Sequence, residues 1–244
     1  DHIDYSISPK VEAKFMLSTF KEKGSIAIPM HLALFNIPLK IASKFNIPLV
    51  VWGENSAFEY GEKEKSDNGF ILNQEWVKKY GVTNGTSAKD WISEDLSERD
   101  LYAYENLSDE QFQKNDTLAI FLGYFLEWDP EMTKQISLNA GFKVDPNGPR
   151  TGYYSHADID DDYISIHHWL KWYKFGFTRL FDNLSIEIRN GRISREKAIK
   201  IIEKDKNLPP IDDIKKFCKF TNITTKEFFE IIEKHRNKKI WKKK

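Results

Sequence analysis

A run of polar side chains follows a short apolar segment in residues 46–64, NIPLVVWGENSAFEYGEKE. After Trp52 and Gly53 come two carboxylates, an amide, a hydroxyl and a phenol, which belong to Glu54, Asn55, Ser56, Glu59 and Tyr60. An ionised carboxylate only accepts hydrogen bonds, so the two glutamates suit a divalent ion that accompanies phosphates, or the donors of a ribose or amine. The amide both donates and accepts, which suits a sugar hydroxyl or another amide. Gly53 allows a ligand or a second backbone to approach closely.

A solvated turn also fits this run, with Glu54 capping a following helix and Tyr60 packed on the surface. The choice between the two interpretations depends on the element that comes before. In open parallel sheets, ligands bind beyond the carboxyl ends of the strands. The ligand-binding interpretation therefore requires residues 47–51 to form a strand of such a sheet, and their apolar run predicts that they do.

The preceding residues predict helices that position this strand. Residues 10–24 have apolar side chains at helical spacing and end at Gly24, and residues 28–45 carry a second helix. Pro38 should kink the second helix or mark its start. Residues 2–7 alternate well enough for a short first strand. Strand, helix, helix, strand and a polar loop is an α/β order, and it indicates a parallel sheet.

Beyond Tyr60 the pattern becomes mostly helical. Residues 118–142 indicate a strand, an irregular Trp-Asp-Pro turn and a helix ended by Gly141, and residues 164–191 indicate a helix with an aromatic stripe. Three further helices are predicted, over residues 194–206, 209–222 and 224–237. We therefore expect an α/β part at residues 1–60 and a mostly helical region at residues 61–244.

Composition limits the class of partner. The 37 basic and 37 acidic side chains of the 244 residues cancel, which argues against nucleic acid or an anionic membrane as a partner. No apolar run approaches the ~20 residues that span a bilayer, and no signal peptide is visible, so we expect a cytoplasmic protein. Cys218, the single cysteine, excludes an internal disulfide and is expected to be buried. We interpret the basic residues 234–244 as a solvated, frayed terminus.

A second group of polar residues lies between Lys174 and Arg192. Arg179 and Asp182 are three apart, on one face if a helix persists, and Arg189 and Arg192 flank a left-handed turn at residues 190–191. An ordinary capped helix with internal ion pairs explains the same residues. A metal site at His167 and His168, with residues 156–162, is disfavoured because adjacent histidines point to different helix faces. The aromatic stripe is expected to be core rather than a sugar platform.

Long stretches of the chain resemble one family. MHLALFNIPLKIASKFNIPLVVWGENSAFEYG, FLGYFLEWDPE, SIHHWLKWYKFGFTRLFDNLSIEIRNGRISREKAI and KFCKFTNITTKEFFEIIEKHRNKKIW are similar to the N-acetyl sugar amidotransferases of bacterial surface-glycan biosynthesis. These enzymes, of lipopolysaccharide O-antigen and pseudaminic acid pathways, belong to the PP-loop ATP pyrophosphatase superfamily. The resemblance implies a Rossmann-like, adenine nucleotide alpha hydrolase-like sheet followed by the helical region.

The chain departs from the family at the phosphate loop. The Ser-Gly-Gly-x-Asp-Ser turn after the first strand does not occur in these residues, and neither does the cysteine pair usual near the family's N-terminus. We therefore expect this chain to be the C-terminal portion of such an enzyme. Its site for ATP and Mg²⁺ would be incomplete, so this chain alone should neither bind ATP well nor turn over.

The resemblance implies conversion of a sugar acetamido group to an acetamidino group. The amide oxygen would attack the α-phosphate of ATP, which releases pyrophosphate and gives an adenylated imidate. Ammonia would then attack the imidate carbon and AMP would leave, with orientation and preorganised charge supplying most of the catalysis. The implied partners are a glutaminase that delivers ammonia, a cyclase-like subunit and a nucleotide-activated acetamido sugar, and a homo-oligomer stays open. The remaining alternatives are a tRNA-thiolating PP-loop enzyme and a non-catalytic helical module that docks a partner.

The same resemblance assigns roles to residues. The acidic loop would contact Mg²⁺ or pyrophosphate through its catalytic residues Glu54, Asn55 and Glu59, with the two glutamates as metal ligands. Substrate or nucleotide would be bound by the neighbouring residues and by the second polar group, namely Trp52, Gly53, Ser56, Tyr60, Lys174, Arg179, Asp182, Arg189 and Arg192. The arginines are suited to clamp a diphosphate or carboxylate bidentately.

Overall fold

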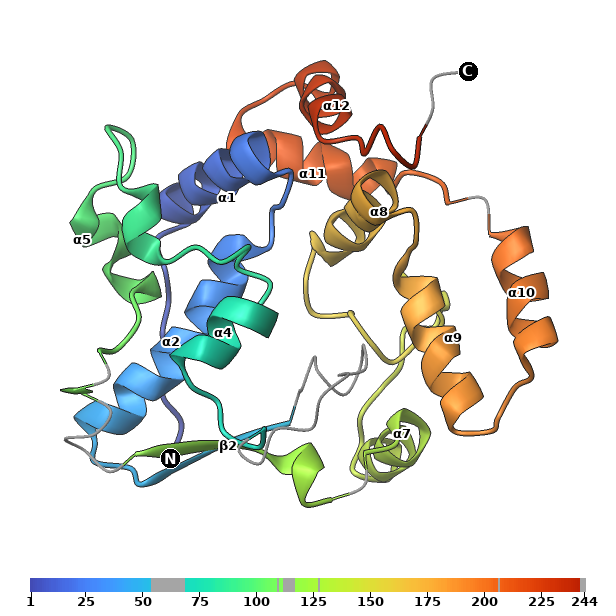
Figure 1. Ribbon diagram of the computed structural model, residues 1–244, viewed down its shortest axis with the longest axis horizontal. Coiled ribbons are helices and arrows are strands. Elements are labelled where there is room, and N and C mark those ends of the chain that lie inside the picture. The colour runs from blue at the N-terminus through green and yellow to red at the C-terminus, as the bar shows by residue number, and fades with distance from the viewer. Residues whose placement is uncertain (54–68, 109, 112–116, 127, 206, 242–244) are drawn as a thin grey trace. The chain divides into compact units, whose positions relative to one another are not determined.

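The computed structural model describes residues 1–53, 69–108, 110–111, 117–126, 128–205 and 207–241. The chain forms two compact units, Asp1–Glu127 and Trp128–Lys244. The division between these units lies well beyond residue 60, because a strand near residue 120 belongs with the N-terminal unit. Each unit is described by itself below (Figure 1).

Two long helices begin the first unit and contribute to its core. Helix α1, Pro9–Lys23, starts at a proline and ends as predicted at Gly24, whose φ of 58° is left-handed. Helix α2, Ile28–Lys44, contains Pro38 in its interior, so this proline neither starts nor ends the helix. Phe15 of α1 packs edge-to-face on the fully buried Tyr104, with ring centroids 4.9 Å apart.

The predicted strand at residues 2–7 is wrong. These residues are exposed except for Ile7, and in the described part of the chain no strand pairs with them. Alternation alone does not form a strand, because each strand needs a neighbour for its backbone hydrogen bonds.

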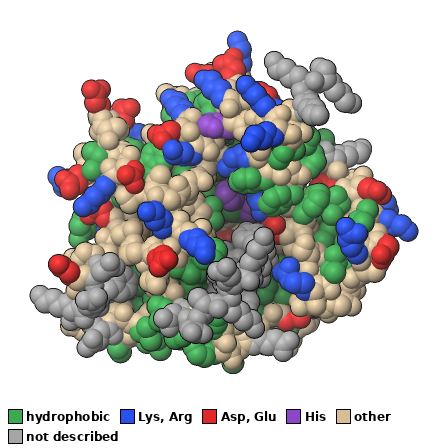
Figure 2. Space-filling model, in the orientation of Figure 1, with side chains coloured by type: hydrophobic (Ala, Val, Ile, Leu, Met, Phe, Trp, Pro, Cys, Tyr) green, Lys and Arg blue, Asp and Glu red, His purple; other side chains and the backbone are tan. Residues whose placement is uncertain are grey.

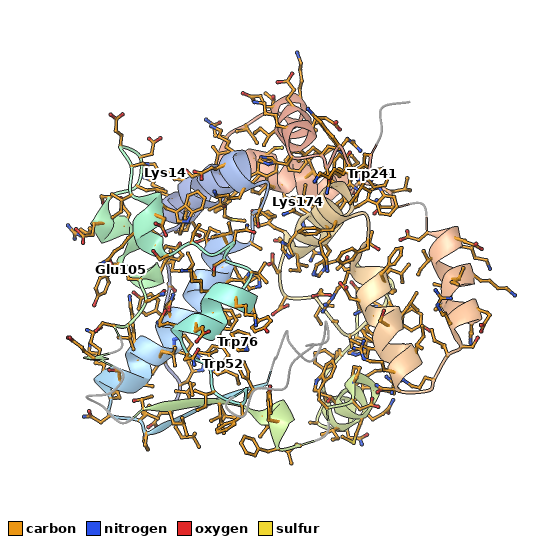
Figure 3. All side chains as sticks on the ribbon, in the orientation of Figure 1. Lys14, Trp52, Trp76, Glu105, Lys174 and Trp241 are labelled. Carbon is orange, nitrogen blue, oxygen red and sulfur yellow. The ribbon has the colours of Figure 1, made fainter. Side chains whose placement is uncertain are left out.

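The described strands form one parallel pair, which confirms the predicted parallel sheet, although the partner of β1 is not the predicted strand at residues 2–7. Strand β1, Leu49–Trp52, pairs with β2, Leu118–Phe121, in the register Leu49↔Leu118 to Trp52↔Phe121. Trp52 and Phe121 face the core. The ring centroid of Trp52 lies 5.5 Å from that of Phe35 on α2, and the ring centroid of Trp76 lies 4.5 Å from that of Phe121. Figure 3 labels the two tryptophans. Leu49, Val51 and Leu118 are exposed on the opposite face.

Short helices complete the first unit. They are α4 (Gln74–Tyr80), α5 (Glu98–Leu101) and the 3₁₀ turns η1 (Ala88–Trp91), η2 (Tyr102–Tyr104) and η3 (Leu122–Tyr124). Within the described ranges every helix is too short or too polar to traverse a lipid bilayer. Basic and acidic side chains are interspersed over the face shown in Figure 2.

The described residues of the second unit are all helix, turn and loop. The helices are α7 (Pro130–Asn139), α8 (Ile164–Phe175), α9 (Arg179–Arg189), α10 (Arg195–Lys204), α11 (Ile211–Thr221) and α12 (Thr225–Lys234). The single helix predicted over residues 164–191 is therefore two helices. Gly176, with φ of 76°, ends α8 and turns the chain into α9.

Two groups of helices share the apolar residues of this unit. Helices α8, α11 and α12 pack together through fully buried residues such as Ile166, Phe217 and Phe228, and Cys218 is buried there as predicted. Helices α9 and α10 lie side by side and bury Leu180, Leu184 and Ala198 (Figure 1).

The predicted frayed terminus is wrong for residues 237–241. The backbone N–H of Asn237 donates to Tyr173 O, its side chain donates to Lys174 O, and Trp241 Nε1 donates to Trp172 O, each at 3.0 Å. The rings of Trp241 and Trp172 lie 4.6 Å apart. The bonds to Tyr173 O and Lys174 O satisfy carbonyls in the last turn of α8, which a helix leaves without internal partners, whereas Trp172 O also accepts the Gly176 N–H.

Candidate functional site

A cavity of 540 Å³ lies inside the second unit. Its walls are the loop 149–153, one face of α8, the start of α9, the end of α10 and the residues Asp205, Asn207, Leu208 and Pro210 that precede α11. Tyr153, Trp169 and Leu180 supply apolar surface, while Arg150, Ser165 and Thr178 supply polar groups. The cavity thus has the mixed lining typical of small-molecule sites.

Gly152 fixes the loop 149–153 onto α9. Its φ is 73°, and a Cβ there would lie 2.2 Å from Asn183 Oδ1 and 2.9 Å from Arg179 Cγ. The next residue, Tyr153, donates its backbone N–H to Asn183 Oδ1 at 2.9 Å. Only glycine allows the loop to approach this closely, so Gly152 sets the position of one wall.

Arg150 is held at the cavity by two carboxylates. Its Nη2 donates to Asp213 Oδ1 at 3.0 Å and to the backbone oxygen of Asp162 at 3.0 Å. Ser165 Oγ donates to the other oxygen of Asp213 at 2.6 Å. Burial alone would lower the pKa of Arg150, but the hydrogen bonds to Asp213 and Asp162 raise it. The guanidinium is therefore a fixed positive charge.

Thr178 stands at the N-cap of α9 without capping it. Its side chain makes no hydrogen bond to the helix, it is only 7% exposed, and its hydroxyl has no partner in the described part of the chain. The Leu180 N–H, in the first turn of α9, makes no backbone hydrogen bond to the described residues. The start of α9 therefore keeps donors that make no hydrogen bond to other described residues.

Asp182 and Arg179 lie in α9, and each has a charged partner from elsewhere in the unit. Lys171 of α8 forms a buried ion pair with Asp182. Asp158 Oδ2 lies 3.6 Å from Arg179 Nε and 4.0 Å from His168 Nδ1. The predicted helical placement of Arg179 and Asp182 is confirmed, while the described ion pairs join α9 to α8 and to the preceding loop instead of running along one helix.

Lys174 lies in the last turn of α8 and is half-buried (Figure 3). Burial, together with the neighbouring charge of Lys171, lowers its pKa to about 8. Within the described part of the chain no carboxylate forms an ion pair with it, and its ammonium lies 5.6 Å from the ring of Phe175. A perturbed amine of this kind is a feature of many functional sites, although structural burial produces it too.

Arg192 belongs to an ion-pair network beyond the end of α9. Its Nε and Nη2 donate to the two oxygens of Glu187 at 2.7 and 2.6 Å, and Nη1 donates to Asp129 Oδ2 at 2.6 Å. Tyr154 OH also donates to Glu187, at 2.6 Å. The predicted left-handed turn is present at Gly191, with φ of 68°, and Arg189 is exposed before it. The described contacts of Arg192 are those of a structural anchor.

The residues predicted at the end of β1 divide into two sets. Trp52 is buried in the core of the first unit, and Gly53 is exposed with open space around its Cα. Glu54, Asn55, Ser56, Glu59 and Tyr60 lie outside the described residues. Their predicted roles toward Mg²⁺, pyrophosphate and substrate therefore stay predictions.

The described residues do not fit a metal ion by themselves. Within the described ranges no group of three His, Cys, Asp or Glu side chains could hold one. In particular, His168 and Asp158 face Arg179, a cation that would compete with a metal for the carboxylate. Most of the aromatic stripe is also accounted for by packing, since Trp169 is buried and Trp172 contacts Trp241.

Sequence reasoning missed Arg150, Ser165 and Thr178. Arg150 lies in a loop without periodicity, and Ser165 lies on a helix face that looks ordinary. Thr178 carried a usable signal, because a threonine two residues after a helix-ending glycine and before an arginine predicts a new helix start.

The C-terminal part of the chain is similar to a known family. Residues 149–244 match the family described as LPS biosynthesis protein WbpG-like, C-terminal domain. A comparison with curated proteins gives no match. The match confirms the predicted relation to lipopolysaccharide biosynthesis for this part of the chain and specifies no activity. All segments that line the cavity fall within the matched residues.

Proposed function

We propose that this chain is part of an ATP-dependent N-acetyl sugar amidotransferase of lipopolysaccharide or related surface-glycan biosynthesis. The observation that carries the proposal is the WbpG-like match over residues 149–244, which contains the whole cavity. The long stretches of sequence that resemble sugar amidotransferases extend the same relation toward residue 30.

The cavity is suited to a sugar. Its 540 Å³ lies within the range of about 300–1,000 Å³ that is usual for small-molecule sites. Tyr153 offers aromatic surface to the apolar face of a pyranose, and Ser165 and Arg150 offer hydrogen bonds to its substituents. We infer that the second unit binds and orients the acetamido sugar.

The chemistry requires activation of a poor electrophile. ATP, when bound with Mg²⁺, supplies the adenylation that turns the amide oxygen into a leaving group. The described residues include no group of three side chains that could hold the Mg²⁺ ion, so we assign ATP and Mg²⁺ to the loop of Glu54, Asn55 and Glu59 together with a phosphate loop. Ammonia from a glutaminase subunit, with a cyclase-like subunit, would then complete the acetamidino group. Lys174, Arg179 and the cavity residues position the substrate.

The test is turnover by the protein that carries this chain, supplied with the phosphate loop and the glutaminase. We expect AMP and pyrophosphate to appear only when a nucleotide-activated acetamido sugar is present. Mass spectrometry should show the sugar's acetamido oxygen replaced by an NH group. ATP consumption that instead requires tRNA would favour the thiolating alternative and contradict the proposal.

Two variants of one loop sharpen this test. Glu54→Gln and Glu59→Gln should each reduce kcat by about 100-fold or more, because they remove charge from the assigned ion site. Glu62→Gln, in the same acidic run, is the matched control and should leave kcat near the wild-type value. Equal losses in all three variants would argue against the assigned roles.

A further inference from the structure

Lys174, in the last turn of α8 (Figure 3), carries an amine that has no counter-ion among the described residues. Its Nζ takes part in no hydrogen bond or ion pair there, and it lies 5.6 Å from the ring centroid of Phe175. We propose that Lys174 is a nucleophilic site, whose amine forms an imine with the carbonyl group of a small aldehyde or ketone. The inference goes beyond the proposed function and does not depend on it.

The charges around α8 explain why the amine lacks a counter-ion. Helix α8 and the segment 237–241 that closes its end contain no acidic residue. Helices α9, α11 and α12 pack against α8, and each of their acids has another partner among the described residues. The pairs are Asp182 with Lys171, Glu187 with Arg192, Asp212 with Lys215, Asp213 with Arg150, Glu227 with Thr224, Glu230 with Lys226 and Glu233 with Arg236. These helices therefore leave the positive charge of Lys174 uncompensated.

The surroundings of Lys174 favour the neutral form of its amine. The residue is half-buried, and Lys171 carries a second ammonium one helical turn earlier. Burial without a counter-ion and a like charge nearby both disfavour the protonated amine. Burial, as the larger cause, and Lys171 lower the pKa of Lys174 to about 8. At pH 7.5 about a quarter of such amines are neutral, compared with about 0.1% of ordinary lysines.

Two phenylalanine rings lie beside the two lysines and give the amine an apolar side. Phe175, next to the Lys174 Nζ, stacks on Phe177 with ring centroids 5.9 Å apart, and the Lys171 Nζ lies 4.9 Å from the Phe177 ring. Phe175 is 54% exposed, so solvent reaches this cluster. The Lys174 Nζ is not among the described buried atoms that lack a partner, so it keeps accessible surface of its own. A small organic molecule can therefore reach both the ring and the amine.

The reaction needs only the amine and a carbonyl compound. The lone pair of the neutral Nζ attacks the carbonyl carbon, and a proton moves from nitrogen to oxygen to give a carbinolamine. Loss of one water molecule then leaves the C=N bond of the imine. Lysines that react in this way are typically desolvated or placed beside another cation, and Lys174 has both features. The expected ligand is therefore an aldehyde or ketone small enough to reach a half-buried amine.

The test is reductive alkylation of the intact wild-type chain with propanal, in which sodium cyanoborohydride traps each imine as a stable amine. Peptide mass spectrometry then gives the alkylation rate of every lysine. Lys200, exposed on α10, is the internal control. At pH 7.5 we expect Lys174 to react at least tenfold faster than Lys200, and the ratio should fall toward pH 10, where ordinary lysines also lose their proton. A ratio below tenfold at pH 7.5 would overturn the inference.

Two phenylalanine variants test whether the surroundings activate the amine. Phe175→Ala removes the ring beside the Lys174 Nζ and admits water to the amine, so the ratio at pH 7.5 should fall at least threefold. Phe45→Ala, directly after α2, is the matched control, because Phe45 is 57% exposed and Phe175 is 54% exposed. This control should keep the wild-type ratio. Both variants should fold, which their melting temperatures check, and a wild-type ratio in Phe175→Ala would contradict the proposal.

Discussion

Replacement of Arg192 by methionine should strongly destabilise the second unit. Three guanidinium nitrogens donate to carboxylates, two of them to Glu187 and one to Asp129, over distances of 2.6–2.7 Å. The other oxygen of Asp129 accepts the backbone N–H groups of Glu131 and Met132 and so caps α7. Arg192 therefore connects the end of α9 to the start of α7.

The magnitude follows from the exposure of the partners. The Glu187 side chain is 8% exposed, whereas Asp129 is 27% and Arg192 is 26% exposed. Removal of one partner from a buried ion pair typically costs ~3–5 kcal/mol, because the other charge is left without compensation. Partial exposure of Asp129 and Arg192 screens part of this loss. We therefore expect Arg192→Met to lower the free energy of unfolding by about 3 kcal/mol.

The assay is urea denaturation of the intact chain, followed by hydrogen exchange on peptides from residues 150–192. Peptides of this region separate unfolding of the second unit from events in the first. The double variant Arg192→Met with Glu187→Met should be less destabilised than the sum of the single variants, because no buried carboxylate remains. A loss of less than about 0.5 kcal/mol in Arg192→Met would refute the network's structural role. It would return Arg192 to the substrate-binding role predicted from the sequence.

Three further predictions concern single groups. The hydrogen bond from Arg192, opposed by burial, lowers the pKa of Glu187 below 4.5. The contribution of Glu187 to the free energy of unfolding is therefore complete above pH 4.5 and is lost as the pH falls through the lowered pKa. Glu187→Gln should flatten this loss in acid denaturation curves. Gly152→Ala should lower the free energy of unfolding by about 2–4 kcal/mol, because of the left-handed φ and the clash with Asn183. Gly191→Ala, with open space around the glycine, should lower it by only about 1–2 kcal/mol in the same denaturation experiments. The pKa of Lys174 is about 8 in the folded chain and 10.5 in the unfolded chain. Between pH 8 and pH 10.5 the unfolded state therefore binds more protons, so the free energy of unfolding should rise with pH over this range, by at most about 3 kcal/mol. Lys174→Met should remove that rise, and a flat wild-type profile would contradict burial of the amine.

Local features of the fold were predictable from the sequence. Gly24 ends a helix because glycine adopts the left-handed φ of 58° that a helix end requires. The apolar run that leads into Trp52 forms a strand, as its composition indicated, although its parallel partner is β2 instead of residues 2–7. The helix end and the strand itself depend on residues that are close in sequence, where pattern and turn chemistry act directly.

Features that join distant residues were not predictable. The strand at residues 2–7 failed because nothing in a sequence shows whether a neighbouring strand exists. Gly176 was visible, but the sequence did not show that it would divide one helix into two and place Lys171 against Asp182. The cavity was missed for the same reason, since its walls come from segments as far apart as residues 149 and 210. Such sites depend on tertiary packing, which local periodicity does not specify.

The closure of α8 by residues 237–241 has a practical consequence for handling this protein. Deletion from residue 237 onward would remove the donors that Asn237 provides to Tyr173 O and Lys174 O, and it would uncover the face of Trp172 that Trp241 now contacts. An affinity tag or fluorescent fusion joined directly after Trp241 would disturb the contacts of Asn237 and Trp241 with the end of α8. Reagents made for these experiments should therefore carry their labels at the other end of the chain, or beyond a flexible spacer.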